Sequence, residues 1–358
     1  MKRKNLYLLS IVFCIALVSA LYGFLQADAQ TSNPQTVATP SPTSTKKPVP
    51  TIVPPPTPVP TPEEDEGVIT VETDIVGLNV RVIDRNNRPI NSLTKNDFQV
   101  YEDNVLQEID SFSKAEVPTN YTMVIDNSGS LRQQLEKVID AGKTIIGTNK
   151  PDDETAIIRF VSSDKIEIKQ EFTNDKAELF DALDNLYIEG GQTAIIDAVY
   201  LAAQMTDEYE KTRNPNDKKR RAVILVTDGE DRDSFYNEQQ LFEILRESDV
   251  QIYVIGFIGD LSKEGGFIAK SPQEKAKNFL EKMAKETGGK AYFPTSVSEL
   301  NGIATDIASE LRTQYLVSYY PTNTKKDGST RQIKVVVSDG PNKQKRIAVT
   351  RTSRKAGN

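Results

Sequence analysis

Short apolar runs alternate with amphipathic stretches through the middle of the chain, from residue 119 to residue 312. Continuous apolar runs of this length are typical of strands that are buried on both faces of a sheet. The amphipathic stretches have the spacing of helices that cover such a sheet. The predicted buried strands are Tyr121–Ile125, Ala156–Phe160, Ala222–Val226, Gln251–Phe257 and Lys290–Phe293. The predicted helices are Leu131–Ile146, Lys176–Leu186, Ala194–Tyr209, Glu238–Glu247, Pro272–Glu286 and Val297–Leu311.

One further segment of this region, Lys165–Phe172, alternates polar and apolar residues, which predicts an antiparallel strand at the sheet edge. Strands that alternate with helices favour an α/β domain with a doubly wound, mostly parallel sheet. In such a sheet, ligands bind beyond the carboxyl ends of the strands. We therefore expect the functional residues of the middle region to follow its strands directly.

The two regions that flank the α/β domain, residues 67–118 and 313–352, also alternate apolar and polar residues. Turn pairs such as Asn86-Asn87 and Asp327-Gly328 separate the predicted strands. Neither region is long enough to form a stable pair of sheets by itself. We therefore expect both regions to pair in one accessory β-sandwich, followed by a short tail at residues 353–358.

The chain begins with a basic and then apolar segment. Lys2-Arg3-Lys4 precedes the apolar run from Leu6 to Leu25, and Ala27-Asp28-Ala29 follows it, so residues 1–29 resemble a secretory signal peptide. The run is close to the ~20 residues of a membrane-spanning helix, so an uncleaved membrane anchor is the alternative. Both interpretations predict a protein that is secreted or held in the cell envelope. Residues 30–66, rich in Pro and Thr, predict an extended linker without a packed core.

Composition excludes several kinds of chemistry. The sequence has no His, and its one cysteine, Cys14, lies inside the N-terminal apolar run. Thiolate and imidazole metal sites are therefore excluded from the folded regions, which leaves hard, oxygen-ligated ions such as Mg²⁺, Mn²⁺ or Ca²⁺. The net charge of −7 argues against nucleic acid as a partner, because phosphate binding needs clustered Lys and Arg. Contact with a membrane is expected only through the N-terminal segment.

Oxygen-bearing side chains follow two of the buried strands and also occur in a glycine-rich loop between these strands. Because the carboxyl ends of parallel strands meet at one edge of a sheet, these side chains can converge on one point. Two carboxylates and three hydroxyls suit a six-coordinate Mg²⁺ or Mn²⁺ ion, with a position left for an acidic group from outside. Each part also has an ordinary interpretation as a turn or a helix cap, but their joint occurrence favours a metal site. The candidate ligands are Asp126, Ser128, Ser130, Thr193 and Asp228.

The order D-x-S-x-S, a glycine-preceded Thr and T-D-G closely resembles the metal-ion-dependent adhesion site of a von Willebrand factor type A domain. The resemblance covers residues 119–312 and implies a Rossmann-like fold. It also implies that Ser128 and Ser130 bind the metal directly, and that Thr193 binds it directly or through water. Asp126 and Asp228 would act largely through bound water. A Glu or Asp of a protein partner would complete the coordination, and the flanking β regions resemble those of secreted bacterial proteins of this group.

Three other polar segments carry weaker hypotheses. Asp231 and Asp233 are interpreted as a solvated acidic loop, with modest tuning of metal affinity as the alternative. The basic run 218–221 precedes the third buried strand, at the opposite sheet edge, and is interpreted as a solvated face. The loop 259–271 leaves a strand at the carboxyl edge, so it is either a flexible connection or a specificity loop with Phe267 as a contact.

A metal-dependent phosphatase on a similar sheet is the rival class of function. Such an enzyme needs a second carboxylate two residues after the first as general acid, and this chain has Ser128 there. The sequence also has no His for a catalytic triad and no phosphate-binding loop motif. A binding protein without enzymatic activity is therefore expected. A structural envelope component that uses the same site between its own copies is the alternative, and the sequence leaves the oligomeric state open.

Overall fold

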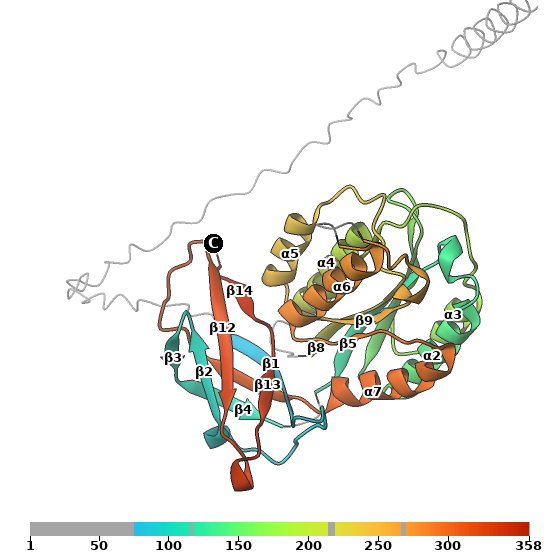
Figure 1. Cartoon of the computed structure of the whole chain (residues 1–358). Coiled ribbons are helices and arrows are strands. Elements are labelled where there is room, and N and C mark those ends of the chain that lie inside the picture. Colours follow the sequence, from blue (N-terminus) through green and yellow to red (C-terminus); the bar gives the residue numbers. More distant parts are fainter. Residues whose placement is uncertain (1–74, 115–116, 214–218, 266–269, 358) are drawn as a thin grey trace, which may run out of the picture. The chain divides into compact units, whose positions relative to one another are not determined.

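The computed structural model describes residues 75–114, 117–213, 219–265 and 270–357 (Figure 1). The expected signal peptide and linker, residues 1–66, lie outside these residues, as does Phe267. Within the described ranges, the helices are too short or too polar to cross a membrane.

A six-stranded sheet in the order β10-β9-β8-β5-β6-β7 forms the centre of the α/β domain. Its parallel strands are β5 (Thr119–Asp126), β6 (Glu154–Phe160), β8 (Arg220–Thr227), β9 (Val250–Gly256) and β10 (Ala291–Tyr292). At one edge β7 (Ile166–Thr173) pairs with β6 in the antiparallel direction. The predicted mostly parallel sheet with an antiparallel edge strand is confirmed.

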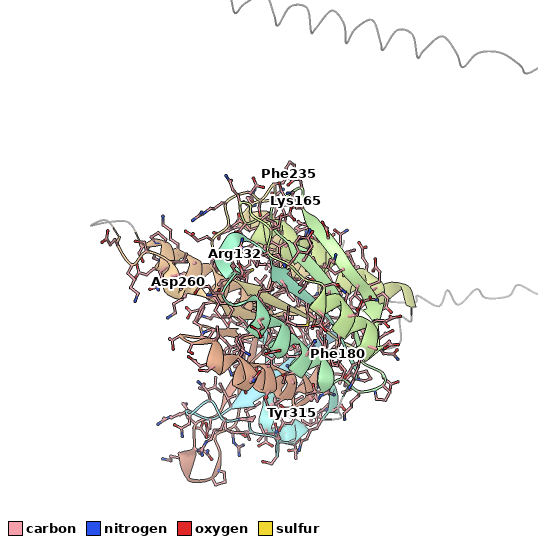
Figure 2. All side chains as sticks on the ribbon, turned by 90° about the vertical axis from the view of Figure 1, so that its right-hand side faces the viewer. Arg132, Lys165, Phe180, Phe235, Asp260 and Tyr315 are labelled. Atoms are coloured by element: carbon pink, nitrogen blue, oxygen red, sulfur yellow. The ribbon has the colours of Figure 1, made fainter. Side chains whose placement is uncertain are left out.

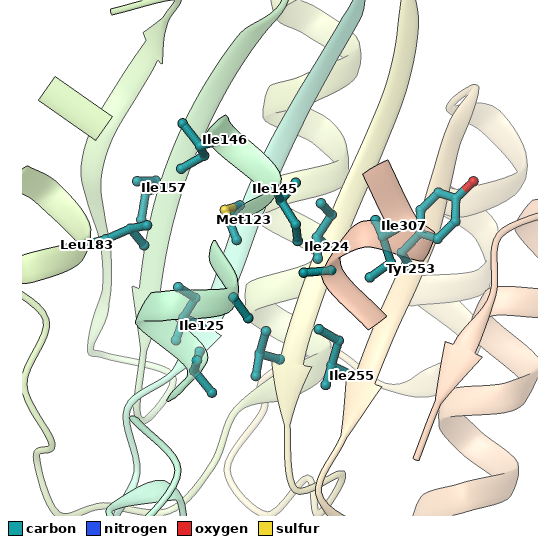
Figure 3. Close-up of a cluster of buried hydrophobic side chains, with 14 of the residues drawn as sticks. Met123, Ile125, Ile145, Ile146, Ile157, Leu183, Ile224, Tyr253, Ile255 and Ile307 are labelled. Atoms are coloured by element: carbon teal, nitrogen blue, oxygen red, sulfur yellow. The ribbon is translucent and has the colours of Figure 1, made fainter. Parts of the chain in front are cut away.

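Helices cover both faces of this sheet (Figure 1). One face packs against α2 (Leu135–Gly147), α3 (Lys176–Asp184) and α7 (Leu300–Arg312). The other packs against α4 (Ile195–Arg213), α5 (Glu238–Glu247) and α6 (Pro272–Thr287). Figure 3 shows the first core, where Met123 and Ile224 of the sheet lie beside Ile145 of α2 and Ile307 of α7. Each fully buried aliphatic side chain contributes about 1.5–3 kcal/mol to folding, so these layers hold the strand ends in place.

The flanking regions form two four-stranded sheets around a hydrophobic core of their own, as predicted. The first sheet contains β13 (Ile347–Val349), β1 (Val76–Ile83), β11 (Tyr315–Tyr319) and β4 (Ile109–Ser113). The second contains β14 (Ser353–Lys355), β12 (Thr330–Val337), β2 (Phe98–Glu102) and β3 (Val105–Gln107). Strands from the two ends of the folded region alternate in the first sheet, and in the second sheet β12 of the C-terminal flank pairs with β2 of the N-terminal flank. Neither flank therefore forms the sandwich alone.

The last strand corrects the sequence analysis, which assigned residues 353–358 to a tail. Ser353–Lys355 form β14 and pair with β12. Arg354 donates to both oxygens of Glu102, a carboxylate that is 2% exposed and also accepts a 2.6 Å hydrogen bond from Tyr319. A buried carboxylate requires such a cationic partner, and this long-range ion pair cannot be recognised from a short polar segment.

The amino edge of the central sheet carries a second correction. Arg220, in the basic run interpreted as a solvated face, is 2% exposed. It donates to the carbonyls of Leu311 (2.7 Å) and Gln314 (2.9 Å), where α7 ends and its last carbonyls lack helical partners. Burial lowers the pKa of the Arg220 guanidinium to about 10. The neighbouring Lys219 pairs with Glu154 at 3.0 Å. The run therefore fastens α7 to the sheet.

Asp153 completes this amino-edge network. Its carboxylate accepts hydrogen bonds from the backbone N–H groups of Thr119 (2.9 Å) and Lys150 (2.7 Å). Arg312, at the end of α7, donates to the same carboxylate at 2.8 Å. The side chain of Asp153 is buried, but each of its neighbours in this network is a hydrogen-bond donor that stabilises its negative charge. The buried carboxylate at the amino edge therefore has all its partners within the protein.

Candidate metal centre

Asp126 ends the central strand β5 and is fully buried. Its Oδ1 accepts from the backbone N–H of Ser128 at 2.9 Å, and its Oδ2 accepts from the Thr227 hydroxyl at 2.8 Å. Burial raises the pKa of the Asp126 carboxyl to about 6; the hydrogen bonds from Ser128 oppose this shift and the charge of Asp228 adds to it. The carboxylate thus lies in a place where negative charge is costly unless a cation is near.

Ser128 and Ser130 lie directly above Asp126. Ser128 has an extended backbone and precedes a short 3-10 turn at Gly129–Leu131, which returns the chain so that both hydroxyls come together. Their Oγ atoms share a hydrogen bond of 2.8 Å. Because of this turn, α2 begins at Leu135, four residues after the predicted helix start at Leu131.

Asp228 follows β8, the strand next to β5, and is 7% exposed. One of its carboxylate oxygens accepts from the backbone N–H of Glu230 at 3.0 Å. Gly229 has a φ of 87°, and a side chain there would come within 2.9 Å of Leu280. Glycine is therefore needed at this position to turn the chain sharply after Asp228.

Thr193 lies at the end of an irregular loop before α4 and is 5% exposed. Because α4 begins at Ile195, Thr193 does not occupy the helix-capping position that the sequence suggests as its ordinary role. Its carbonyl accepts from the backbone N–H groups of Arg232 (2.8 Å) and Asp233 (3.2 Å). These bonds join the Thr193 loop to the loop that carries Asp228.

A cavity of about 300 Å³ brings four of the predicted ligands together. Ser128, Ser130, Thr193 and Asp228 line it, and Asp126 lies below, bonded to Ser128. Figure 2 shows the same end of the α/β domain, marked by Arg132 and Asp260, opposite the end at which Tyr315 lies. The structure thus gathers the whole predicted set at the carboxyl edge of the sheet.

The carboxylate and hydroxyl oxygens of these side chains are suitable ligands for a hard divalent cation. Octahedral Mg²⁺ holds its oxygens at 2.0–2.1 Å, which separates neighbouring ligand oxygens by about 3 Å. The 2.8 Å spacing of the two serine oxygens agrees with adjacent positions of that geometry. Among the described residues, groups of three or more His, Cys, Asp or Glu side chains with metal-binding geometry are absent. The candidate site instead combines two carboxylates with three hydroxyls.

Two residues that the sequence analysis did not single out position the Thr193 loop. Asn127 donates its side-chain amide to the carbonyl of Tyr187 at 2.8 Å and accepts from the N–H of Glu189 at 2.9 Å through its own carbonyl. Arg159 lies 4.3 Å from the Tyr187 ring centre and pairs with Glu189 at 3.1 Å. A charged residue inside the otherwise apolar run Ala156–Phe160 is the pattern that could have indicated this role.

The interpretation of Asp231 and Asp233 as a solvated acidic loop is wrong. Asp231 accepts from the backbone N–H of Ile196 at 3.1 Å and from the Ser234 hydroxyl at 2.6 Å. Asp233 accepts from the backbone N–H of Ser163 at 3.1 Å. The first N–H groups of a helix such as α4 have no helical partners, and Asp231 supplies one. Both carboxylates therefore fasten the loop after β8 to neighbouring elements.

The family model of the von Willebrand factor type A domain matches residues 120–310, more than half of the chain. The chain therefore belongs to the von Willebrand factor type A family. An uncharacterised protein of the cyanobacterium Synechocystis, sll0103, is 32% identical over 115 residues. That match covers 32% of this chain and 26% of the relative, so the chain spans about a quarter of that curated protein.

Solved structures with a similar fold come from diverse sources. A von Willebrand factor type A protein from Catenulispora acidiphila has a TM-score of 0.43 and 12% identity, covering 79% of this chain and 73% of that one. An aerotolerance-related membrane protein from Bacteroides fragilis has a TM-score of 0.42 and 22% identity, covering 54% and 98%. Proximal thread matrix protein 1 from the mussel byssus, with a zinc-occupied adhesion motif, has a TM-score of 0.43 and 17% identity, covering 55% and 48%.

Proposed function

We propose that this chain is an exported binding protein without enzymatic activity, and that it binds the carboxylate of a partner protein through a divalent cation. The ion would be held by Asp126, Ser128, Ser130, Thr193 and Asp228. Mg²⁺ is the proposed ion, and Mn²⁺ or Ca²⁺ would bind the same oxygens. The observation that carries the proposal is the pair of serine hydroxyls, 2.8 Å apart, facing a cavity above the buried Asp126.

Each ligand has a distinct task in this proposal. The hydroxyls of Ser128 and Ser130 bind the ion directly, and Thr193 approaches from the facing loop. Asp126 lies one layer deeper, where it accepts from Ser128 N–H and holds the serine turn in place. Because the directly bound hydroxyls are neutral and the two carboxylates would act largely through bound water, the ion would attract a Glu or Asp side chain to its open position.

We propose no catalysed reaction for this chain. Ser128 stands where a phosphatase of similar fold would have its general acid, and the sequence has no His. The N-terminal basic and apolar segment supports export, and the Pro-rich residues 30–66 support a spacer that separates the binding domain from the cell surface.

Water-proton relaxation of Mn²⁺ bound to the full chain tests the proposal. An ion with an open position keeps exchangeable water, which enhances the relaxation rate. The capped peptide acetyl-Gly-Glu-Gly-amide should replace that water and lower the enhancement, whereas acetyl-Gly-Gln-Gly-amide should leave it unchanged. Equal responses to both peptides would contradict carboxylate capture.

A Ser130→Ala variant is the matched control for the metal itself, because Ser130 is exposed and its loss should not disturb the core. This variant should bind Mn²⁺ more weakly, by about tenfold or more, the scale reported for losses around metal sites. If the chain and the variant bound Mn²⁺ equally, the ion would lie elsewhere and the proposed site would be wrong.

A further inference from the structure

Phe235 is an exposed aromatic residue on the loop between β8 and α5, with 83% of its surface accessible to solvent. Its ring meets Tyr236 edge to face, with 5.4 Å between the ring centres. Tyr236 in turn stacks on Tyr200 of α4 at 4.1 Å, with the two rings nearly parallel. The three rings form a ladder that begins in the domain and ends in solvent. Burying a large ring of this kind is the main source of binding energy at protein interfaces.

Partly buried hydrogen bonds hold the backbone of this ladder in place. The carboxylate of Asp197, in the first turn of α4, accepts from the N–H groups of Phe235 (2.8 Å) and Tyr236 (2.9 Å). Ser234, the residue before, accepts from the N–H of Asp197 at 3.2 Å and donates to Asp231 at 2.6 Å. A fixed backbone loses little conformational entropy when a partner covers the ring, so Phe235 is suited to act as a contact.

A groove of about 440 Å³ lies beside these rings. Its lining includes the three aromatic residues together with Ile166 of β7, Leu201 of α4 and the carboxylate of Asp164. Among the described residues that line it, none is a Lys or Arg. A hydrogen bond from the Ser162 hydroxyl holds the pKa of the exposed Asp164 below its usual value. Lys165, which does not line the groove, also lowers the pKa of Asp164 by its positive charge. The groove therefore combines aromatic rings with an exposed carboxylate that is hydrogen-bonded to Ser162 and has a basic neighbour outside the lining.

The groove begins close to the proposed metal site. Thr193 precedes α4 by two residues, and its carbonyl accepts from the N–H groups of Arg232 and Asp233, which lie just before Phe235 on the same loop. Figure 2 shows Phe235 at the same end of the domain as Arg132, which follows the serine turn. One partner segment could therefore contact both places.

We propose that this groove, here called the Phe235 groove, binds a cationic side chain of the partner protein, with arginine preferred over lysine. The inference rests on the proposed function and adds a basic residue near the carboxylate that completes the metal site. A guanidinium stacks on aromatic faces and donates to carboxylates at once, whereas an ammonium is more strongly hydrated and stacks less well. The carboxylate of Asp164 also disfavours partners that present an acidic side chain there.

Fluorine NMR of the full chain, labelled with 4-fluorophenylalanine, tests the proposal. The resonance of Phe235 is assigned by its loss in a Phe235→Leu variant. Titration with acetyl-Gly-Arg-Gly-amide should shift this resonance with saturation, and acetyl-Gly-Gln-Gly-amide should not. An equal response to both peptides, or no saturable response to the arginine peptide, overturns the Phe235 groove.

Two aspartate variants provide a matched comparison. Asp164→Asn should weaken binding of the arginine peptide about threefold, the effect of losing one exposed ion pair. Asp152→Asn, an exposed acid at the amino edge of the sheet, should leave the affinity unchanged. Equal weakening by both variants would indicate a general charge effect and overturn the proposed site.

Mn²⁺ binding in the same samples separates this inference from the proposed function. If Mn²⁺ binds and the arginine peptide does not shift Phe235, only the groove is overturned. If the peptide shifts Phe235 and Mn²⁺ does not bind, the metal-dependent function fails and the groove stands as a site for cations alone.

Discussion

The two ends of the central sheet each bury an aspartate, but in opposite surroundings. At the amino edge, Asp153 accepts from two backbone N–H groups and from Arg312. At the carboxyl edge, Asp126 accepts from Ser128 N–H and the Thr227 hydroxyl, and lies beside a second carboxylate, Asp228. Within the described residues, Asp126 has no ion pair.

This difference separates a structural polar network from the proposed metal site. A buried charge that its partners compensate needs no ligand, and removing one of those partners destabilises the fold. A buried charge without a cation destabilises the fold until a ligand supplies one, which is typical of functional sites. The same residue type is therefore compensated at one edge and, among the described residues, without a cationic partner at the other, which is the edge of the proposed metal site.

The largest effect is expected from Asp153→Asn. The amide removes the negative charge opposite Arg312 and turns an N–H donor toward groups that already donate. We expect a loss of about 3 kcal/mol in the free energy of unfolding, measured by urea denaturation of the full chain. The neighbouring exposed Asp152→Asn is the control and should change stability by less than about 0.5 kcal/mol.

A contrary result would be equal stability of both variants. It would show that the hydrogen bonds around Asp153 contribute nothing that water does not replace. Asp153 would then not stabilise the amino edge, and the proposed contrast between the two edges would be wrong.

The same substitution at the other edge, Asp126→Asn, should act in the opposite direction on the metal-free protein. The pKa of Asp126 near 6, compared with 3.8 ordinarily, corresponds to a charge that costs up to about 3 kcal/mol at neutral pH. Urea denaturation in the presence of a chelator should show a gain of about 1–3 kcal/mol. A loss comparable to that of Asp153→Asn would mean that Asp126 is a structural residue.

The pH dependence of this gain has a definite sign. A group whose folded pKa is raised contributes stability below its unfolded pKa and loses that contribution as the pH rises through the folded value. The difference in the free energy of unfolding between the Asp126→Asn variant and the unsubstituted chain should therefore be largest above pH 6 and should disappear below about pH 4. A difference that stays constant with pH would assign the effect to packing.

Metal affinity should follow the same ionisation, with a smaller effect near neutral pH. Binding requires a deprotonated ligand, so the apparent affinity for Mn²⁺ should be nearly constant above pH 6 and fall about tenfold per pH unit below it. Relaxation titrations at several pH values measure this profile. Constant affinity down to pH 4 would exclude Asp126 from the site.

The sequence predicts the α/β domain well because its strands are apolar runs and its helices are amphipathic. The segment Lys165–Phe172 also indicates its edge position through alternation alone. The clustering of the candidate ligands is predictable for a related reason, because Asp126 and Asp228 follow strands that are neighbours in a parallel sheet. Local pattern and strand topology together specify where these residues meet.

Other features depend on contacts that sequence patterns do not show. Arg220 belongs to a basic run that is typical of a solvated surface, yet α7 covers it and accepts its hydrogen bonds. Asp231 binds an N–H of α4, thirty-five residues earlier in the chain, and by doing so fixes the loop that exposes Phe235. Such long-range partners decide burial, and one residue's type and neighbours do not reveal them.

Calorimetric titration of the full chain with Mn²⁺ and Mg²⁺, alongside Asp126→Asn, tests the central claim most directly. We expect about one ion per chain, with affinity reduced at least tenfold in the variant while the fold is retained. Equal binding by both proteins, or none by the unsubstituted chain at millimolar Mn²⁺, would contradict a metal site at the carboxyl edge of the sheet.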